Sequence, residues 1–506
     1  MLTKADRPCR RAAGLRLFAA FVAGAASVLA FAPFEIYPLG LLSLALLVYL
    51  SARVEQPRAG FGLGFAWGMG SFLAGISWLF IALNRYGGVS APVAALAIAL
   101  FCAYLALFPA LAAGLFVRLR PRSVGLGALA FAGVWTLAEM LRGRLFTGFP
   151  WLAIGYSQTP PSPLAGFFPV LGVYGVGFVL ALLAAVLGLA VQRGRSALFA
   201  GLALLALSCA GGMALARIHW TAPVGAPLSV ALIQTNIGQA LKWAPESLAE
   251  VFTINADLVR AQSADLVVLP ETTLPMLADQ LPGDFLATLS APVRAAGADL
   301  LLGVFTRDAA GRIFNSAISL GASPEQIYSK RHLVPFGEYL PPFFGWFYRI
   351  ADIPMSDQTR GASDQPPLRL AGQRIAVNIC YEDLFGHELI GGLPDATLFL
   401  NLSNLAWYGE SFAQPQHLQI ARARAMESGR PMLRATNTGM TAVVQVDGRV
   451  TGVLPQFERG ALHVSVQGHQ GMTPYGQWGD LAALVLAVFA LGLLVLAPRR
   501  SAEPVE

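Results

Sequence analysis

Three residues in the second half of the chain have the types and the order that acyl transfer requires. Glu271 follows an apolar run and a proline, Lys330 lies in a short polar stretch, and Cys380 ends an apolar run. Acyl transfer by a thiol needs a base, a cation that stabilises the oxyanion, and the nucleophile itself. Any one of these residues alone is more often a solvated or packing side chain. Together they predict a covalent acyl-transfer site.

The run before Cys380 alternates apolar with smaller or polar residues, which predicts a strand buried on one face. Such a strand would present Cys380 at its carboxyl end. Glu382, Asp383 and Gly386 follow and predict the start of a short helix. Since the N-terminus of a helix favours negative charge, we expect this helix to favour the thiolate of Cys380.

The sequence around these three residues resembles the Glu-Lys-Cys motifs of the nitrilase (carbon-nitrogen hydrolase) superfamily. The matching segments are Leu269-Pro270-Glu271, Tyr328-Ser329-Lys330 with His332 to Glu338, and Asn378-Ile379-Cys380-Tyr381-Glu382. Within the superfamily they most resemble the apolipoprotein N-acyltransferase family, marked by a long loop here spanning Leu333 to Tyr339 and by membrane helices around the catalytic domain. The resemblance covers nearly the whole chain.

This resemblance implies a role for each residue of the site. Glu271 would be the general base, Lys330 would stabilise the thiolate and the oxyanion, and Cys380 would be the nucleophile. Glu338 would be an auxiliary carboxylate that positions Lys330 or moves protons. A backbone N–H near Tyr381 would assist Lys330.

The resemblance also implies a ping-pong reaction at a lipid surface. Cys380 would take a fatty acyl chain from a phospholipid as a thioester and pass it to the α-amine of the N-terminal S-diacylglyceryl-cysteine of an apolipoprotein. The expected partners are thus a phospholipid donor, a diacylglyceryl apolipoprotein acceptor and the membrane, without nucleic acid, metal or cofactor. A membrane-tethered amidase that uses water as acceptor is the alternative. A non-enzymatic scaffold is disfavoured because the Glu, Lys and Cys residues are all present.

Several further residues are candidates for contact with substrate. They are Tyr381, Glu382, Trp243, Trp407, Arg142 and Trp151. Trp407 lies in a stretch from Asn401 to Gly409 that resembles the family's substrate-proximal loop, although Leu405 stands where some members have Asp. Trp243 and the aromatic residues Phe343, Phe344, Trp346 and Phe347 are candidates for an apolar entry, with ordinary packing as the alternative.

Other charged residues near the motifs leave alternatives open. Glu139 and Arg142 are three residues apart and predict either a structural ion pair or a site for a phospholipid head group. His417 and His332 are rival bases that would form a dyad with Cys380. We rank both below Glu271, since no Cys-His protease motif is present.

The composition requires a membrane for part of the chain. Of 506 residues, 55% are hydrophobic and only 13% are charged, against about 25% charged in soluble domains. Seven apolar segments precede residue 220, at 14–32, 36–52, 61–83, 91–117, 123–141, 164–191 and 196–216, and an eighth covers 481–496. The four cysteines show no metal or disulfide spacing. Basic residues beside the spans explain the net charge of +6.

The basic residues also predict the orientation, because short cytoplasmic loops are rich in Lys and Arg. One set of alternate loops carries Lys4, Arg7, Arg10, Arg11, Arg53, Arg58, Arg118, Arg120, Arg122, Arg193 and Arg195. The N-terminus is therefore expected in the cytoplasm. Seven spans would then place the following domain outside, on the periplasmic side of a bacterial inner membrane. Arg499 and Arg500 after the last span agree with this orientation.

From about residue 228 the pattern changes to alternating strands and helices, with a hairpin at Asp447-Gly448. Helices are expected over 245–262, 276–296 and 414–428. The expected fold class is a membrane domain of about eight transmembrane helices plus an extracytoplasmic α/β nitrilase-like domain, for which the family resemblance implies an αββα sandwich. The expected boundaries are 1–220 for the membrane domain, 228–470 for the catalytic domain and 480–498 for the last span.

Overall fold

The computed structural model describes residues 6–119, 123–341 and 357–496. The aromatic residues Phe343, Phe344, Trp346 and Phe347 lie outside the described residues, as do Lys4, Arg120, Arg122, Arg499 and Arg500. The predicted entry and part of the charge pattern therefore stay predictions.

All eight predicted apolar segments form helices. They are α1 (Asp6–Ser27), α2 (Pro38–Ser51), α3 (Pro57–Ile76), α5 (Ala91–Leu119), α6 (Val124–Arg142), α7 (Phe168–Ala190), α8 (Arg195–Leu215) and α15 (Leu481–Leu496). In the described part of the chain, six helices are long and apolar enough to cross a membrane, and α2 and α15 are shorter apolar helices. A count of eight spans therefore stays a prediction. The third segment was expected to continue to residue 83, but α3 ends at Ile76.

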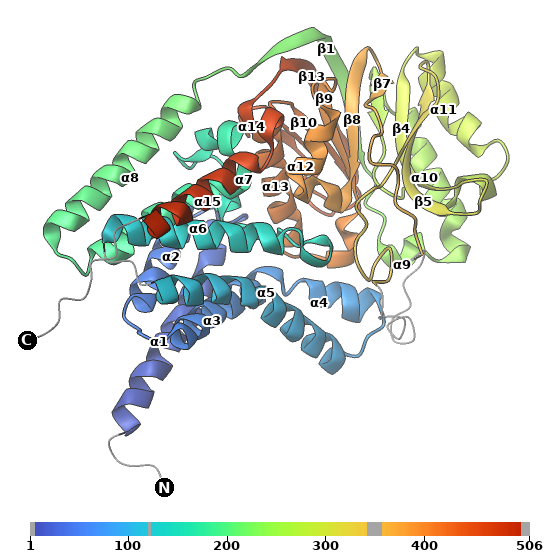
Figure 1. Ribbon diagram of the computed structural model, residues 1–506. Coiled ribbons are helices and arrows are strands. Elements are labelled where there is room, and N and C mark those ends of the chain that lie inside the picture. Colours follow the sequence, from blue (N-terminus) through green and yellow to red (C-terminus); the bar gives the residue numbers. More distant parts are fainter. Residues whose placement is uncertain (1–5, 120–122, 342–356, 497–506) are drawn as a thin grey trace, which may run out of the picture.

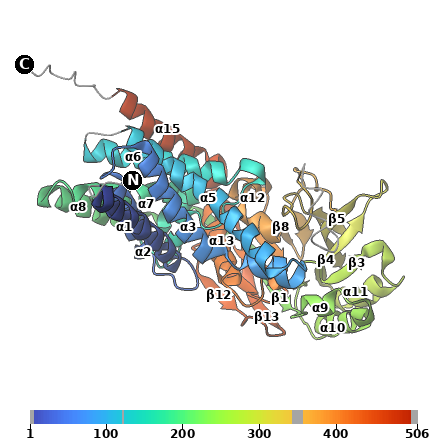
Figure 2. The ribbon, with the colours of Figure 1, turned by 90° about the horizontal axis from the view of Figure 1, so that it is seen from below.

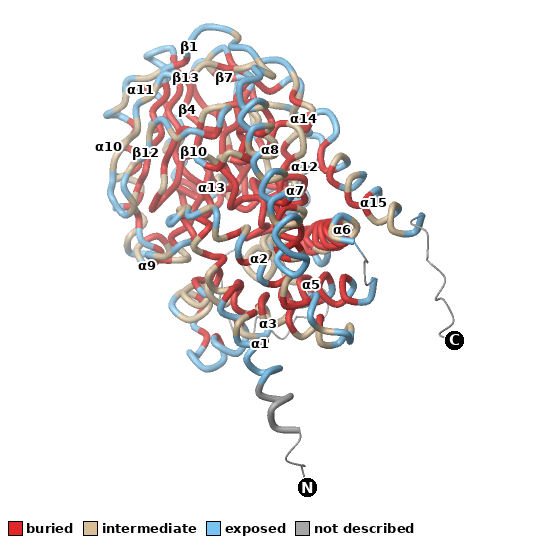
Figure 3. The backbone as a smooth tube through the Cα atoms, turned by 90° about the vertical axis from the view of Figure 1, so that its left-hand side faces the viewer, coloured by how far each residue is buried: buried red, intermediate tan, exposed pale blue. Residues whose placement is uncertain are grey.

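Glycines on α3 let its neighbours approach closely, as the glycine-rich sequence predicts. A Cβ on Gly64 would lie 2.2 Å from the carbonyl oxygen of Pro109 in α5. A Cβ on Gly70 would lie 2.0 Å from the carbonyl oxygen of Phe21 in α1. Backbone contact on two sides fixes α3 between α1 and α5. By contrast α8 lies on the outside of the molecule, and most of its length is exposed (Figure 3).

The α/β domain contains two mixed sheets packed face to face. The first has the order β13-β1-β2-β4-β5-β6, with β3 also paired to β4. The second has the order β12-β11-β10-β9-β8-β7. The strands of the first sheet are β1 (Thr221–Gln234), β2 (Leu266–Val268), β3 (Leu274–Leu277), β4 (Asp299–Arg307), β5 (Ile313–Gly321), β6 (Gln326–Ser329) and β13 (Gly460–Gly471). Those of the second are β7 (Leu368–Leu370), β8 (Gln373–Ile379), β9 (Leu398–Ser403), β10 (Met432–Thr436), β11 (Ala442–Val444) and β12 (Val450–Val453).

Alternation along the strands builds the layers. In β1, Val230 and Leu232 point into the core between the sheets. Ala231 and Ile233 point the other way, toward α10 (Leu248–Arg260) and α11 (Phe285–Ala295). These two helices cover the face of the sandwich farthest from the membrane helices (Figures 1 and 2). The expected αββα layering is confirmed. The expected helix over 276–296 is wrong in its first third, where β3 is followed by a 3₁₀ turn, Ala278–Gln280.

The other outer helix, α13 (Ala413–Ser428), lies between the second sheet and the membrane helices. Leu418, Ala421 and Ala425 pack on that sheet. Ile420, Ala423 and Met426 pack into the core of the membrane domain. A helix with partners on both sides has no single apolar stripe. The two domains consequently share one continuous interface along α13.

Candidate active site

Glu271 lies on a strained turn directly after β2. The next residue, Thr272, has φ 48°, a left-handed conformation that is uncommon for a side chain branched at Cβ. Gly303 of β4 passes so close that a Cβ there would lie 2.7 Å from the Cα of Glu271. The Glu271 carboxylate is 5% exposed and accepts hydrogen bonds from Asn315 Nδ2 (2.8 Å) and Asn404 N (2.8 Å). The surrounding backbone therefore fixes where this carboxylate points.

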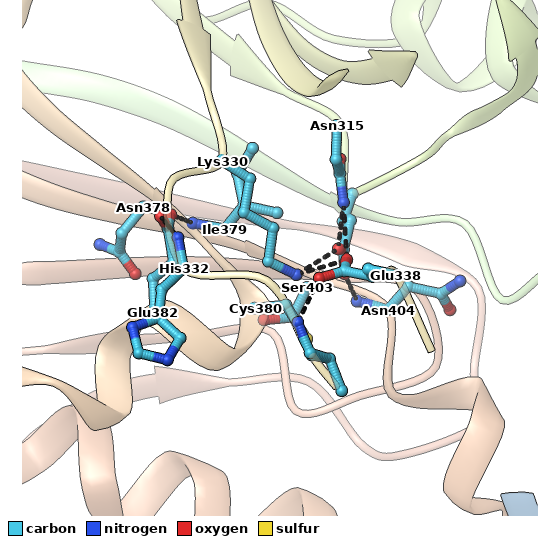
Figure 4. Close-up of polar contacts among 12 residues, drawn as sticks. Asn315, Lys330, His332, Glu338, Asn378, Ile379, Cys380, Glu382, Ser403 and Asn404 are labelled. Atoms are coloured by element: carbon cyan, nitrogen blue, oxygen red, sulfur yellow. Dashed lines mark hydrogen bonds and ion pairs between the residues drawn. The ribbon is translucent and has the colours of Figure 1, made fainter. Parts of the chain in front are cut away.

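Lys330 follows β6 and is fully buried. Its Nζ lies 2.7 Å from Glu338 Oε1 and 3.4 Å from Glu271 Oε1. Although burial disfavours the charged amine, the carboxylates of Glu338 and Glu271 raise the pKa of Lys330 above its ordinary value. In Figure 4, Lys330, Glu338 and Asn315 point toward one another, with Cys380 beside them. Lys330 is thus a permanent cation between two carboxylates.

Cys380 ends β8 and has φ 53°, another left-handed conformation. Its carbonyl oxygen accepts a hydrogen bond from Asn401 Nδ2 (3.1 Å), which holds the turn against β9. Burial and the charge of Glu271 raise the pKa of the Cys380 thiol well above its ordinary value, more than Lys330 lowers it. The expected thiolate is therefore wrong for the free protein. The short 3₁₀ turn Cys380–Leu384 after the thiol does not offset the loss of water and the nearby anion.

Glu382 connects the lysine and cysteine segments. Its Oε1 accepts from the backbone N–H groups of Arg331 (2.8 Å) and His332 (3.1 Å), and its Oε2 accepts from the N–H of Ile379 (2.6 Å). Tyr328 also donates its hydroxyl to both oxygens. The sequence-based expectation of substrate contact therefore needs correction, because this buried carboxylate already has protein partners that fix Lys330 relative to Cys380.

Tyr381, next to Cys380, joins the site to the membrane domain. Its hydroxyl donates to the carbonyl oxygen of Gly148 (2.8 Å), in the loop after α6. Arg142 and Trp151 lie at the two ends of the same loop. Arg142 is 2% exposed, donates to the carbonyl oxygens of Phe149 and Trp151 (both 2.7 Å) and lies 3.6 Å from Glu139. The structural ion pair is therefore present, and Arg142 holds the loop that receives Tyr381.

The tryptophan candidates occupy three different places. Trp151 is buried and donates its indole N–H to Gln416 of α13 (2.8 Å). Trp407 is half-buried, with its ring 5.8 Å from that of Tyr86 in the membrane domain. Trp243 is half-buried beside Phe305, and its indole N–H has no hydrogen-bond partner within the described residues. Trp407 and Trp243 remain predicted substrate contacts. Trp151 lies at the interface between the two domains.

The rings of both rival bases have other polar partners. His417 Nε2 lies 2.6 Å from Asp383, and its Nδ1 lies 2.9 Å from the Arg434 guanidinium. Burial and the Arg434 cation lower the pKa of His417 despite the Asp383 charge. His332 stacks on Phe385 (3.6 Å between ring centres) and bonds to Glu388 (2.8 Å). The carboxylates next to the lysine are those of Glu271 and Glu338, and both act on the pKa of the Cys380 thiol.

Sequence reasoning missed three residues of the site. Asn315 donates to both Glu271 and Glu338, at 2.8 and 3.2 Å. Lys242 is 2% exposed, and its amine lies 3.4 Å from the carbonyl oxygen of Glu271. Tyr408 follows Trp407 in the same loop; its ring lies 4.6 Å from that of Trp78, and burial raises the pKa of its phenol. An asparagine in a strand and a lysine beside a tryptophan carry no sequence signal of this kind.

Comparison with known proteins agrees with this fold and this site. The family model for carbon-nitrogen hydrolases matches residues 229–471. The α/β domain is therefore nitrilase-like. A second model, for the apolipoprotein N-acyltransferase N-terminal domain, matches residues 23–186.

Relatives match both domains at once. The proteins named apolipoprotein N-acyltransferase from Nitrosomonas europaea and Chromobacterium violaceum are 48% and 45% identical, each over 95% of this chain and over 96% and 93% of their own lengths. This chain belongs to the apolipoprotein N-acyltransferase family. Among solved structures, an amidase from Nesterenkonia sp. AN1 is 18% identical, with a TM-score of 0.38 over 48% of this chain and 92% of that chain. At that level it adds nothing to the assignment, which rests on the sequence relatives.

Proposed function

We propose that this protein transfers a fatty acyl chain from a phospholipid to the α-amine of the N-terminal S-diacylglyceryl-cysteine of apolipoproteins, by a ping-pong route through a thioester on Cys380. One observation carries the proposal. The residue after the nucleophile, Tyr381, donates a hydrogen bond to Gly148 of the membrane domain, so the acyl-transfer site is attached to the part of the protein that contacts lipid. Membership of the family supports the choice of acceptor.

In the first half-reaction Glu271 takes the thiol proton while Cys380 Sγ attacks the ester carbonyl carbon of the phospholipid. The raised thiol pKa makes this base necessary, because little thiolate exists beforehand. Lys330 stabilises the negative charge that develops on the carbonyl oxygen. The C–O bond then breaks, Glu271 returns its proton to the departing alkoxide, and a lysophospholipid leaves.

In the second half-reaction the neutral α-amine of the acceptor attacks the thioester carbonyl. Glu271 takes a proton from the nitrogen, the C–S bond breaks, and the Cys380 sulfur is reprotonated, leaving an amide. Exclusion of water protects the thioester from hydrolysis between the two steps. Glu338, at 2.7 Å, keeps Lys330 charged and oriented in both.

The catalytic domain is placed on the periplasmic side of the inner membrane in this proposal. Support comes from the basic residues that the described loops carry on one side, among them Arg53, Arg58, Arg193 and Arg195. Cysteine accessibility tests it directly. A membrane-impermeant maleimide should label a cysteine introduced at exposed Asp395 in intact spheroplasts, and should not label one introduced at Arg193.

The acyl transfer itself is tested with two substrates added in turn. The purified protein is first incubated with phospholipid alone and its intact mass is measured beside that of Cys380→Ser. A hydroxylamine-labile fatty acyl increment on wild type, mapped to Cys380, is the expected result. Addition of a diacylglyceryl-cysteine peptide should then remove the increment and yield an N-acylated peptide.

Two outcomes contradict the proposal. Absence of any adduct on lipid-replete wild type would remove phospholipid as the donor. An adduct that decays at the same rate with and without the peptide, releasing free fatty acid, would favour the membrane-tethered amidase.

A further inference from the structure

A second buried lysine lies beside Glu271 and contacts its main chain. Lys242 ends the short helix α9 (Gln239–Lys242) and is 2% exposed. Its Nζ lies 3.4 Å from the main-chain carbonyl oxygen of Glu271, on the turn that Thr272 strains. Lys330 instead approaches the Glu271 side chain. Lys330 thus contacts the side chain of Glu271, and Lys242 contacts its main chain.

The two lysines differ in their ionic partners. Lys330 lies within ion-pair distance of two carboxylates. Within residues 6–119, 123–341 and 357–496, no carboxylate oxygen lies within 4.0 Å of the Lys242 amine. A buried ammonium ion with no carboxylate partner is costly, so the neutral amine is favoured. A neutral amine still donates the hydrogen bond to the Glu271 carbonyl oxygen.

The other charges around Lys242 do not alter this balance. The neighbouring helix α10 carries Glu250, Asp257 and Arg260, all of them exposed. Glu271 is the one group whose charge acts appreciably on Lys242. Burial lowers the pKa of Lys242 to about 7, against the opposing effect of Glu271.

We infer that Lys242 is a positioning residue for the catalytic base, which holds the Glu271 turn as a neutral amine and weakens the base when it gains a proton. A cation close to Glu271 stabilises the anionic form of its carboxylate. A more stable carboxylate takes the thiol proton less readily. Acylation of Cys380 then slows as Lys242 gains a proton on acidification. This inference rests on the proposed acyl transfer, because it assumes that Glu271 is the base.

The test measures acylation of Cys380 by p-nitrophenyl acetate, from pH 5.5 to 8.5, in the full-length protein in detergent. The burst of p-nitrophenol reports the first half-reaction without a phospholipid, and Cys380→Ser supplies the background. Lys242→Gln keeps a donor for the Glu271 carbonyl oxygen but never becomes charged. Arg260→Gln removes an exposed cation from the neighbouring helix and serves as the matched control.

Between pH 8 and pH 6, the wild-type burst rate is expected to fall at least about threefold more than the Lys242→Gln rate, since near pH 6 most of Lys242 is protonated. Arg260→Gln should follow wild type. Parallel profiles of wild type and Lys242→Gln would overturn the inference, because a purely structural lysine changes the rate equally at every pH.

Wild type alone decides the matter if Lys242→Gln does not fold. A burst rate that falls between pH 8 and pH 6 with a midpoint near pH 7 supports protonation of Lys242, and a rate that stays constant over this range rejects it. Failure of the proposed function is separately visible. In that case phospholipid gives no adduct while p-nitrophenyl acetate still acylates Cys380.

Discussion

Lys330 lies closer to Glu338 (2.7 Å) than to Glu271 (3.4 Å). Glu338 is therefore its nearer ionic partner, and in the proposed mechanism Glu271 is left free to exchange a proton with Cys380. This division of roles explains why a site that needs one base contains two carboxylates.

The first prediction concerns this pair. Glu338→Gln removes the closest anion from a buried cation, so Lys330 loses charge and orientation where the oxyanion forms. We expect kcat to fall by about 100-fold, as when one oxyanion donor is removed. Glu325→Gln, on the exposed turn before β6, is the control and should keep wild-type turnover. A rise in KM with an unchanged kcat would assign Glu338 to substrate binding instead.

The second prediction separates thiol ionisation from acyl transfer. The charge of Glu271 is one of the two largest causes of the raised Cys380 pKa. Because Glu271→Gln removes that charge and leaves Lys330 in place, thiolate forms at lower pH than in wild type. Iodoacetamide should then alkylate Cys380 several times faster at pH 8, while acyl transfer falls by about 10²- to 10⁴-fold. Cys380→Ser serves as the control for labelling of the other cysteines. Slower alkylation of Glu271→Gln than of wild type would contradict the conclusion that the Glu271 charge raises the pKa of Cys380.

The third prediction concerns Glu382. Glutamine in place of Glu382 would turn an NH2 group toward backbone N–H groups that now donate to the carboxylate. Those buried N–H groups would then lose their acceptor. We expect Glu382→Gln to lower the free energy of unfolding by about 1–3 kcal/mol per unpaired N–H. The melting temperature in detergent measures it, with exposed Asp395→Asn as the control. An unchanged melting temperature together with lost activity would return Glu382 to a role at the substrate.

The fourth prediction is a pH dependence of stability. The pKa of His417 is lowered in the folded protein, so the unfolded chain binds the extra proton. The stabilisation is therefore present above the unfolded pKa of about 6.5 and is lost as pH falls through the lower, folded pKa. Between pH 7.5 and 5, the melting temperature of wild type should fall further than that of His417→Gln. His219→Gln, at an exposed histidine, should behave as wild type, and equal slopes in all three proteins would contradict the assignment.

Most of the site residues that could be predicted from the sequence lie at the ends of apolar runs. Glu271 follows a continuous apolar run and Cys380 an alternating one, and alternation predicts which faces of a strand are buried. Val230 and Ala231 accordingly enter different cores. Local patterns thus predicted a mixed α/β domain and the three chemical groups, whereas the αββα layering was implied by the family resemblance.

Contacts between residues far apart in the chain could not be predicted from such local patterns. Glu382 reads as the first turn of a helix, yet its carboxylate binds the backbone of Arg331, 51 residues away. The state of the Cys380 thiol depends on the balance between burial, Glu271 and Lys330, which no local pattern contains. From the sequence, Lys242 would be predicted to be a solvated lysine. Only the folded chain places its amine beside the carbonyl oxygen of Glu271.

The interface along α13 has a consequence for recombination between relatives. Glu427 accepts the N–H of Val173 (2.7 Å), a donor freed where Gly172 interrupts α7, and Arg422 bonds to Glu35 in the loop between α1 and α2. A chimaera that joins the first 220 residues of one homologue to the remainder of another would mismatch these contacts. Inheritance of the two halves is therefore linked, because a substitution at Glu35 removes a partner of Arg422, and one at Glu427 removes the acceptor of the Val173 N–H.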